Sequence, residues 1–210
     1  MATERNSKLS EALLDVRRSY RVIGAYQKRI LGLIDYIGRS LPEAVFDGWE
    51  PQKWDKPGRY ILPSDDKWSL DGLPFFALSV RFLLPENTIG SERFECAIDI
   101  LHDADTGIDD VDFGKESDLS ELKNPRETES VLYFCGWKSD SPFTRAEWRA
   151  RYGKPGGPTE DDVLQKLPPG EWWAFRKSYR IESLVDRADV DQAVAEFLAE
   201  LQKQGFNLPS

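Results

Sequence analysis

Apolar side chains recur along the first 41 residues at alternating steps of four and three. The positions in this seam are Leu9, Leu13, Val16, Tyr20, Ile23, Gln27, Ile30, Ile34, Ile37 and Leu41. This heptad spacing predicts one long helix with a continuous apolar stripe. We expect the helix to begin near Asn6 or Ser7, either of which can cap its first amides. It must end near Leu41, because Pro42 cannot continue it.

The seam has two interpretations, pairing with another helix or packing on the protein's own sheet. When Val16, Ile23 and Ile30 are taken as a positions, their β-branched side chains favour two parallel strands. Tyr26 and Leu33 widen the stripe on one side, which favours burial in a larger core. We predict that the seam from Leu9 to Ile37 is a homodimer interface, with packing on the sheet as the alternative.

Further along the chain, apolar and polar residues alternate with a period of two. This pattern predicts strands at residues 74–84, 93–101, 130–138 and 171–181. A short strand at 59–62 is expected in the Trp- and Pro-rich connection that follows the first helix. The first two strong strands have no helix between them, which favours antiparallel pairing.

Two further helices are expected in the second half of the chain. Thr144 and Glu147 have the spacing of a capping box and predict a short helix that runs to about Tyr152. Residues 159–162 predict a helical turn, and Asp189 predicts the start of a final amphipathic helix that ends at Gly205.

The predicted fold class is therefore α+β, with a long N-terminal helix, a mostly antiparallel sheet of four to five strands, and a C-terminal helix packed on the sheet. The expected organisation is a helical element at residues 1–41 and a single α+β domain at residues 42–210.

Charge is divided unevenly along the 210 residues, whose net charge is −9. Residues 1–41 hold 8 basic and 4 acidic residues, a net charge of 8 − 4 = +4. The remaining residues hold 20 basic and 33 acidic residues, a net charge of 20 − 33 = −13. An acidic body disfavours a broad nucleic-acid surface, because phosphates are repelled. Direct contact with nucleic acid is left to the basic helix alone.

Cysteine usage and hydropathy indicate where the protein works. The two cysteines, Cys96 and Cys135, lie in predicted strands and are expected to be buried thiols in a reducing cytoplasm, with a disulfide as the alternative. The N-terminus lacks the apolar run of a signal peptide, and no apolar stretch is long enough to span a membrane. We therefore expect a soluble cytoplasmic protein.

Acidic residues are densest between Asp99 and Asp112. Several oxygen ligands from one loop suit a hard cation such as Ca²⁺ or Mg²⁺, so Asp99, Asp103, Asp105 and Asp109 are candidate ligands. The register of a calcium loop fails, because Gly114 occupies the position of the bidentate Glu. We favour a docking patch for a basic partner, comprising Asp103, Asp105, Asp109 and Asp110.

The last predicted strand carries aromatic and basic residues together. Alternation turns Trp173 and Phe175 toward the core and leaves Trp172, Arg176 and Arg180 on the opposite face. Arg81, Glu95 and Asp99 are expected as neighbours on that face. Trp172, Arg176 and Arg180 are accordingly candidate partner-binding residues.

Catalytic arrangements are weak by comparison. His102 beside Asp103 could act as a general base, but no nucleophile motif accompanies it, and a structural role is favoured. Asp99, Glu129 and Lys138 are the residue types of a metal-dependent nuclease. Glu129 and Lys138 nevertheless lie about 30 Å apart if the strand between them is extended.

Together these patterns favour a non-enzymatic adaptor, inhibitor or immunity-type protein that assembles as a homodimer through its N-terminal helix. Its acidic body would engage a basic partner, and no cofactor is expected. Two alternatives stay open: a metal-dependent hydrolase that uses the acidic cluster, and nucleic-acid binding through the basic helix.

Overall fold

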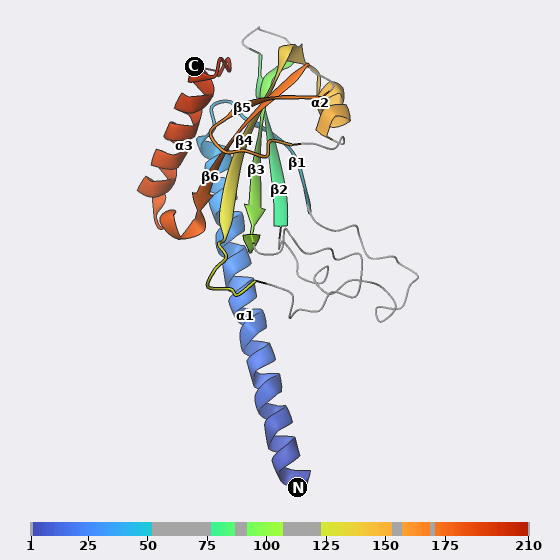
Figure 1. Cartoon of the computed structure of the whole chain (residues 1–210), viewed down its shortest axis with the longest axis vertical. Coiled ribbons are helices and arrows are strands. Elements are labelled where there is room, and N and C mark those ends of the chain that lie inside the picture. Colours follow the sequence, from blue (N-terminus) through green and yellow to red (C-terminus); the bar gives the residue numbers. More distant parts are fainter. Residues whose placement is uncertain are drawn as a thin grey trace. The chain divides into compact units, whose positions relative to one another are not determined.

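The computed structural model describes residues 2–51, 77–86, 92–106, 123–152, 157–168 and 171–209. The chain divides into two compact units, Met1–Tyr36 and Ile37–Ser210. The first unit belongs entirely to helix α1, Ala2–Ser40, whose last turn lies in the second unit (Figure 1). The helix begins earlier than the capping residues Asn6 and Ser7 suggested, and it ends two residues before Pro42.

A six-stranded antiparallel sheet forms the centre of the second unit. Its strands are β1 Val45–Pro51, β2 Ala77–Pro85, β3 Phe94–Asp103, β4 Val131–Phe143, β5 Leu164–Leu167 and β6 Trp172–Arg180. Their order is β1-β2-β3-β4-β6-β5, and every neighbouring pair is antiparallel. The α+β class and the antiparallel sheet are confirmed, with one strand more than the upper expectation.

Two short strands at the edges of the sheet account for the higher strand count. β1 lies in the segment that was taken for a connection, and β5 follows residues 159–162, where a helical turn was expected. That expectation is wrong: Asp161 forms an isolated bridge with Arg176, and Asp162 has a positive φ of 59°. The predicted strand at 59–62 lies outside the described residues.

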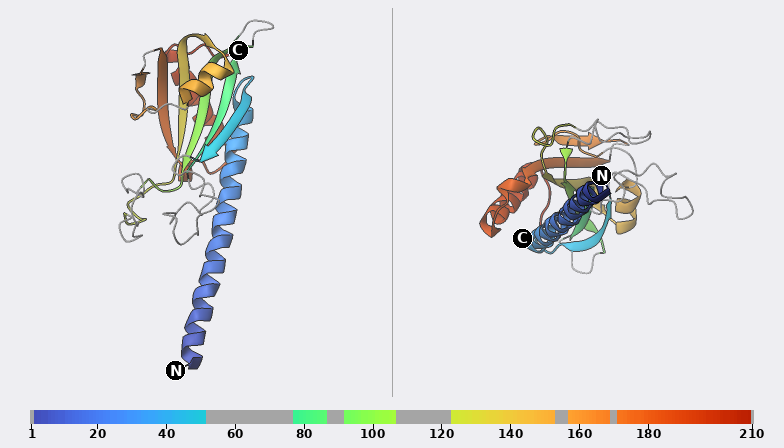
Figure 2. Two further views of the ribbon diagram at one scale, coloured as in Figure 1. Left: turned by 90° about the vertical axis from the view of Figure 1, so that its right-hand side faces the viewer. Right: turned by 90° about the horizontal axis from the view of Figure 1, so that it is seen from below.

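Helix α3, Arg187–Lys203, covers one face of the sheet (Figures 1 and 2). A capping box between Asp186 and Asp189 opens it, so Asp189 is the third helical residue rather than the cap. Phe197 on its apolar stripe meets Phe134 of β4 edge-on, with ring centroids 5.4 Å apart. Gly205, at φ 76°, ends the helix in the left-handed conformation that glycine tolerates.

The last turn of α1 packs on the same sheet. Ile37 and Leu41, the final two seam residues, are buried within the second unit. A Cβ added at Gly38 would lie 2.4 Å from the ring of Phe82 on β2. The helix backbone therefore comes so close to β2 that only glycine fits without a shift.

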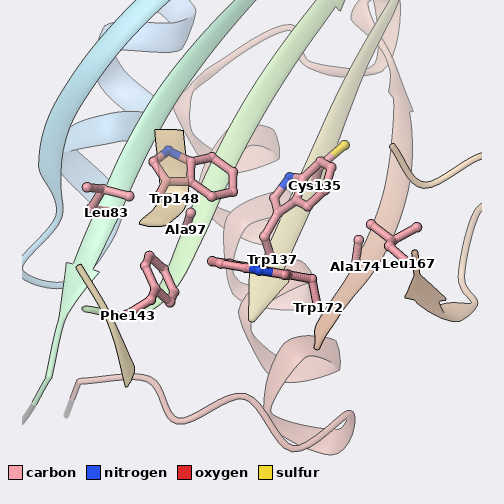
Figure 3. Packing of buried hydrophobic residues seen from close by; sticks show 9 residues of the cluster. All are labelled: Leu83, Ala97, Cys135, Trp137, Phe143, Trp148, Leu167, Trp172 and Ala174. Atoms are coloured by element: carbon pink, nitrogen blue, oxygen red, sulfur yellow. The ribbon is translucent and has the colours of Figure 1, made fainter. Parts of the chain in front are cut away.

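Helix α2, Arg145–Tyr152, covers the opposite face (Figure 2). The predicted capping box is confirmed, because the Thr144 amide donates to Glu147 at 2.6 Å and the Glu147 amide donates to the Thr144 hydroxyl at 3.2 Å. Trp148 of α2 is fully buried in an aromatic cluster with Trp137, Phe143 and Trp172 (Figure 3).

Ion pairs hold α2 on the edge of the sheet. Arg145 and Arg149 both reach the same carboxylate oxygen of Asp47 on β1, at 3.2 Å each. The Asp47 side chain is only 1 % exposed. Removing this carboxylate would leave two guanidinium groups without their described partner and free α2 at its edge contact.

No helix within the described residues has both the length and the apolar character needed to cross a membrane.

Candidate functional site

A buried polar cluster lies on the sheet face beneath α2. We call it the Asp99 network; its members are Glu50, Ser79, Arg81, Asp99 and Tyr152. Arg81 of β2 stands opposite Asp99 of β3, and Ser79 opposes Glu50 of β1. Ser79 and Arg81 share one face because residues two apart on a strand point the same way. Tyr152 reaches this face from the last residue of α2.

Hydrogen bonds join the buried members of the Asp99 network. The Ser79 hydroxyl donates to Asp99 Oδ1 at 2.5 Å, and the Tyr152 hydroxyl lies 2.7 Å from Ser79 Oγ and donates to Asp99 Oδ2 at 3.4 Å. Ser79 is fully buried and Asp99 is 5 % exposed. α2 is thus tied to the centre of the sheet through its terminal tyrosine.

Arg81 completes the network on the side of the edge strand. Its guanidinium pairs with Glu50 at 3.1 Å and lies over the Tyr152 ring, 4.3 Å from the centroid. Burial favours the neutral form of Arg81, but Glu50, Tyr152 and Asp99 outweigh this effect and raise the pKa of the guanidinium. Arg81 therefore stays charged.

Burial has the largest effect on the pKa of both Asp99 and Tyr152. It raises the pKa of Asp99 to about 6, although the Ser79 hydrogen bond, the Arg81 charge and the Tyr152 hydrogen bond act in the opposite direction. Burial also raises the pKa of the Tyr152 phenol, and the Asp99 charge adds to the effect. Asp99 can exchange a proton near neutral pH, whereas the buried Ser79 hydroxyl is not open to a substrate.

The network adjoins a second charged contact on the same face. Asp99 is opposite Cys135 of β4, which is opposite Arg176 of β6. The Arg176 guanidinium donates to Asp161 at 2.5 Å and to the carbonyls of Pro158 and Thr159 at 3.2 and 2.7 Å. Arg176 therefore fastens residues 158–161 to the sheet.

Trp172, Arg176 and Arg180, the predicted partner-binding residues of the last strand, have different environments in the structure. Trp172 is only 8 % exposed and packs against Phe143 at a centroid distance of 4.8 Å, so its expected outward position is wrong. Arg176 is engaged in holding the segment before β5. Arg180 is 56 % exposed and pairs with Glu129 and Glu182 at 2.9 and 3.0 Å. Of the three, Arg180 alone presents a largely exposed side chain.

The aspartates predicted to bind a cation or a basic partner do not form one cluster in the described part of the chain. Asp99 lies in the network, Asp103 is buried and accepts a hydrogen bond from the Asp105 amide at 3.1 Å, and Asp105 is half-buried. Asp109 and Asp110 lie outside the described residues. Across the described ranges there is no group of three His, Cys, Asp or Glu side chains that could hold a metal ion.

The structure also places the remaining chemical candidates apart. Lys138 donates to the carbonyls of Gln204 and Gly205 at 2.7 and 2.9 Å and so caps the end of α3, whereas Glu129 pairs with Arg180. His102 is buried on the α3 face of the sheet, opposite Leu78 and Leu132. The nuclease-like set of Asp99, Glu129 and Lys138 is therefore not brought together.

Both cysteines are free buried thiols, as expected. Cys96 stands opposite Lys138 of β4, whereas Cys135 stands opposite Asp99 of β3. These register positions place the two thiols on opposite faces of the sheet, because Lys138 and Cys135 are an odd number of residues apart. Burial raises the pKa of both thiols, which keeps them protonated.

The solvent exposure of the seam residues decreases along α1. Leu9, Leu13, Val16 and Tyr20 are 60 %, 47 %, 49 % and 67 % exposed. Ile23 and Gln27 are half-buried, and the members from Ile30 onward are buried. The first half of the predicted interface is thus an exposed apolar stripe within the described residues.

Two cavities flank the end of β4 at Ser139, Ser141 and Pro142, with volumes of about 260 and 430 Å³. The larger one is lined by Trp173, whose indole N–H donates to Asp140 at 3.0 Å, and by Lys138, which caps α3. These polar groups already form hydrogen bonds within the protein, so we prefer the Asp99 network to either cavity as the candidate functional site.

Arg81 and Asp99 were expected on the face of Arg176, and the register confirms that placement. Ser79 and Tyr152 were missed as functional residues. The signal for Ser79 was a polar residue inside an otherwise apolar strand, two positions before an arginine. The sequence held no signal for Tyr152, because its role depends on where α2 folds back.

Comparison with known proteins gives two matches. A family model described as PM0109 matches residues 6–207. A Pasteurella multocida (strain Pm70) protein described as "Uncharacterized protein PM0109" is 26 % identical over 133 residues, which are 62 % of this chain and 63 % of that relative. The matched region thus spans less than two thirds of the relative's length. No solved structure matches the chain.

Proposed function

The chain belongs to the PM0109 family, and we propose that it works through protein–protein contact as a self-associating adaptor or regulatory protein. The observation that carries this proposal is the exposed stripe of Leu9, Leu13, Val16 and Tyr20 on α1. Contiguous exposed apolar residues are typical of interaction surfaces. A helix that leaves its apolar stripe in water also lacks the packing that stabilises most helices.

A second copy of the chain is the occupant that fits this stripe best. The stripe follows a heptad repeat, and a heptad seam is complementary to another heptad seam. From Leu9 to Gln27 the seam is about 27 Å long at 1.5 Å per residue, which is enough for several layers of core residues.

The expected number of chains in the oligomer follows from the order of the three- and four-residue spacings along the seam. Within a heptad, a to d is three residues and d to a is four, so Leu9, Val16 and Ile23 are d positions and Leu13 and Tyr20 are a positions. β-branched residues at d shift the preference from two strands toward three or four. The seam residues therefore do not favour a parallel pair, and we propose self-association with more than two chains.

Sedimentation equilibrium of the full chain tests this proposal. We expect an oligomer for the natural sequence and a monomer for the double variant Leu13→Ser/Val16→Ser, which removes two core positions. Arg18→Ser is the matched control, because Arg18 is 67 % exposed and its described ion pair, with Asp15 at 3.1 Å, lies within the same helix. A natural sequence that sediments as a monomer at all concentrations would refute the proposal.

The acidic body is the second part of the proposal. Residues 42–210 have an excess of 33 − 20 = 13 acidic residues, which would attract a basic partner and repel polyanions. We also propose a cytoplasmic location, supported by the two free buried thiols. Binding of a basic protein that weakens steeply with salt would support this part; binding that ignores salt would count against it.

A further inference from the structure

Helix α2 is held on its face of the sheet by contacts of three kinds. Two of its arginines pair with the buried carboxylate of Asp47 on β1, at 3.2 Å each. Trp148, in the middle of the helix, is fully buried in the aromatic cluster. Tyr152, the last residue, forms hydrogen bonds with Ser79 and Asp99. The third contact differs from the other two, because it ties the helix to a buried carboxyl that can exchange a proton near neutral pH.

The contact at Tyr152 joins the helix directly to two strands. Its hydroxyl lies 2.7 Å from Ser79 Oγ and donates to Asp99 Oδ2 at 3.4 Å, and its ring lies 4.3 Å from the Arg81 guanidinium. Ser79 donates to the other oxygen of Asp99 at 2.5 Å, and both residues are buried. Moving α2 away from the sheet would withdraw one hydrogen-bond donor from Asp99 and let water reach its carboxyl.

The titratable groups beside Asp99 belong to five elements of the fold. They are Glu50 of β1, Arg81 of β2, Cys135 of β4, Arg176 of β6 and Tyr152 of α2. Burial has the largest effect on Asp99 and raises its pKa to about 6. The hydrogen bonds from Ser79 and Tyr152 act in the opposite direction, as does the Arg81 charge, whereas the Glu50 charge adds to burial. The Cys135 thiol stays protonated, because burial raises its pKa well above the ordinary value.

Movement of α2 and protonation of Asp99 are therefore linked. The pKa of Asp99 is about 6 with α2 in place, and it returns toward the ordinary value of 3.8 when water reaches the carboxyl. A raised pKa in the covered state means that the covered state loses stability as the pH rises through 6. The equilibrium constant for uncovering Asp99 should rise by up to about a hundredfold in all, and by about tenfold between pH 5 and pH 7.5.

We propose that α2 is a pH-sensitive lid, tied to the sheet through Tyr152, Ser79 and Asp99, which opens more often when Asp99 is ionised. Opening is local, because α3 packs on the opposite face of the sheet and makes no part of this contact (Figure 2). Burial of Trp148 keeps the lid closed most of the time at either pH. The lid is independent of self-association through α1, and neither proposal needs the other.

Amide hydrogen exchange of the full chain at pH 5 and pH 7.5, with and without low concentrations of urea, tests the lid. The reporters are the amides of α2 from Trp148 onward; the Trp148 amide donates to the Thr144 carbonyl at 3.0 Å. After correction for base-catalysed exchange, their protection should fall about tenfold between the two pH values. It should depend little on urea, because a local opening exposes little surface. The amides of α3 are the comparison, since exchange through global unfolding depends strongly on urea.

Three variants identify the group that senses pH. Asp99→Asn should remove the pH dependence of α2 protection. Tyr152→Phe keeps the ring but removes the donor that stabilises the charged carboxyl, so it should lower α2 protection more at pH 7.5 than at pH 5. Arg149→Gln is the matched control, because it weakens the contact with Asp47 and should lower α2 protection by the same factor at both pH values.

Three results would overturn the proposal. In the first, the amides of α2 and α3 exchange at the same rate with the same urea dependence, so that only global unfolding exposes α2. In the second, α2 protection does not change with pH. In the third, Asp99→Asn keeps the pH dependence or Arg149→Gln removes it, which would transfer the pH response to another group.

Discussion

Replacing Asp99 with asparagine should change how the stability of the protein depends on pH. The carboxyl is 5 % exposed, and burial raises its pKa to about 6 from the ordinary aspartate value of 3.8. The folded state therefore binds a proton more tightly than the unfolded state does. For a group with a raised folded pKa, stability is fully present below the unfolded pKa and is lost as the pH rises through the folded pKa.

The size of the effect follows from the shift. A difference of about two pKa units corresponds to about 3 kcal/mol, since each unit is worth about 1.36 kcal/mol. Asp99 should thus lower the free energy of unfolding by about that amount between pH 4 and pH 7. The Asp99→Asn variant keeps an acceptor for the Ser79 hydroxyl but has no charge to bury. Its free energy of unfolding should therefore not fall in this way as the pH rises.

Urea unfolding of the natural chain and of Asp99→Asn across that pH range measures the effect. The difference between the two free energies of unfolding removes the contribution of other acidic groups, and it should grow in favour of asparagine as the pH rises. Asp191→Asn, an exposed change on α3, supplies the comparison. A difference that stays constant with pH, or that grows in favour of aspartate, would refute the assignment of burial as the dominant influence on Asp99.

Two packing predictions can be checked by the same unfolding assay. Gly38→Ala should destabilise the protein by about 1–2 kcal/mol, because the clash of a new Cβ with Phe82 outweighs the gain in helix propensity. Gly24→Ala, where no atom lies within 4 Å, should instead raise helicity in circular dichroism; equal effects at both glycines would contradict the packing argument. Arg176→Lys should cost about 1–3 kcal/mol, because lysine cannot reproduce the fork that binds Asp161 and two carbonyls, and an unchanged urea midpoint would contradict that role.

The long elements could be predicted because each one buries a face with a clear period. Helix α1 and strands β2, β3, β4 and β6 all carry several apolar residues at the proper spacing, and the capping box at Thr144 is a local signal. β1 and β5 were not predicted from the sequence, and there is a physical reason. They are short edge strands, and β1 contains a glycine and a bulge that interrupt its alternation.

The candidate site was predictable only in part. Alternation and pairing placed Arg81, Asp99 and Arg176 on one face, but the sequence does not specify which face a short helix will cover. The position of α2 decides that Asp99 and Trp172 are buried, and it brings Tyr152 to Ser79 from 73 residues away. Long-range coverage of this kind leaves no periodic signal in the chain.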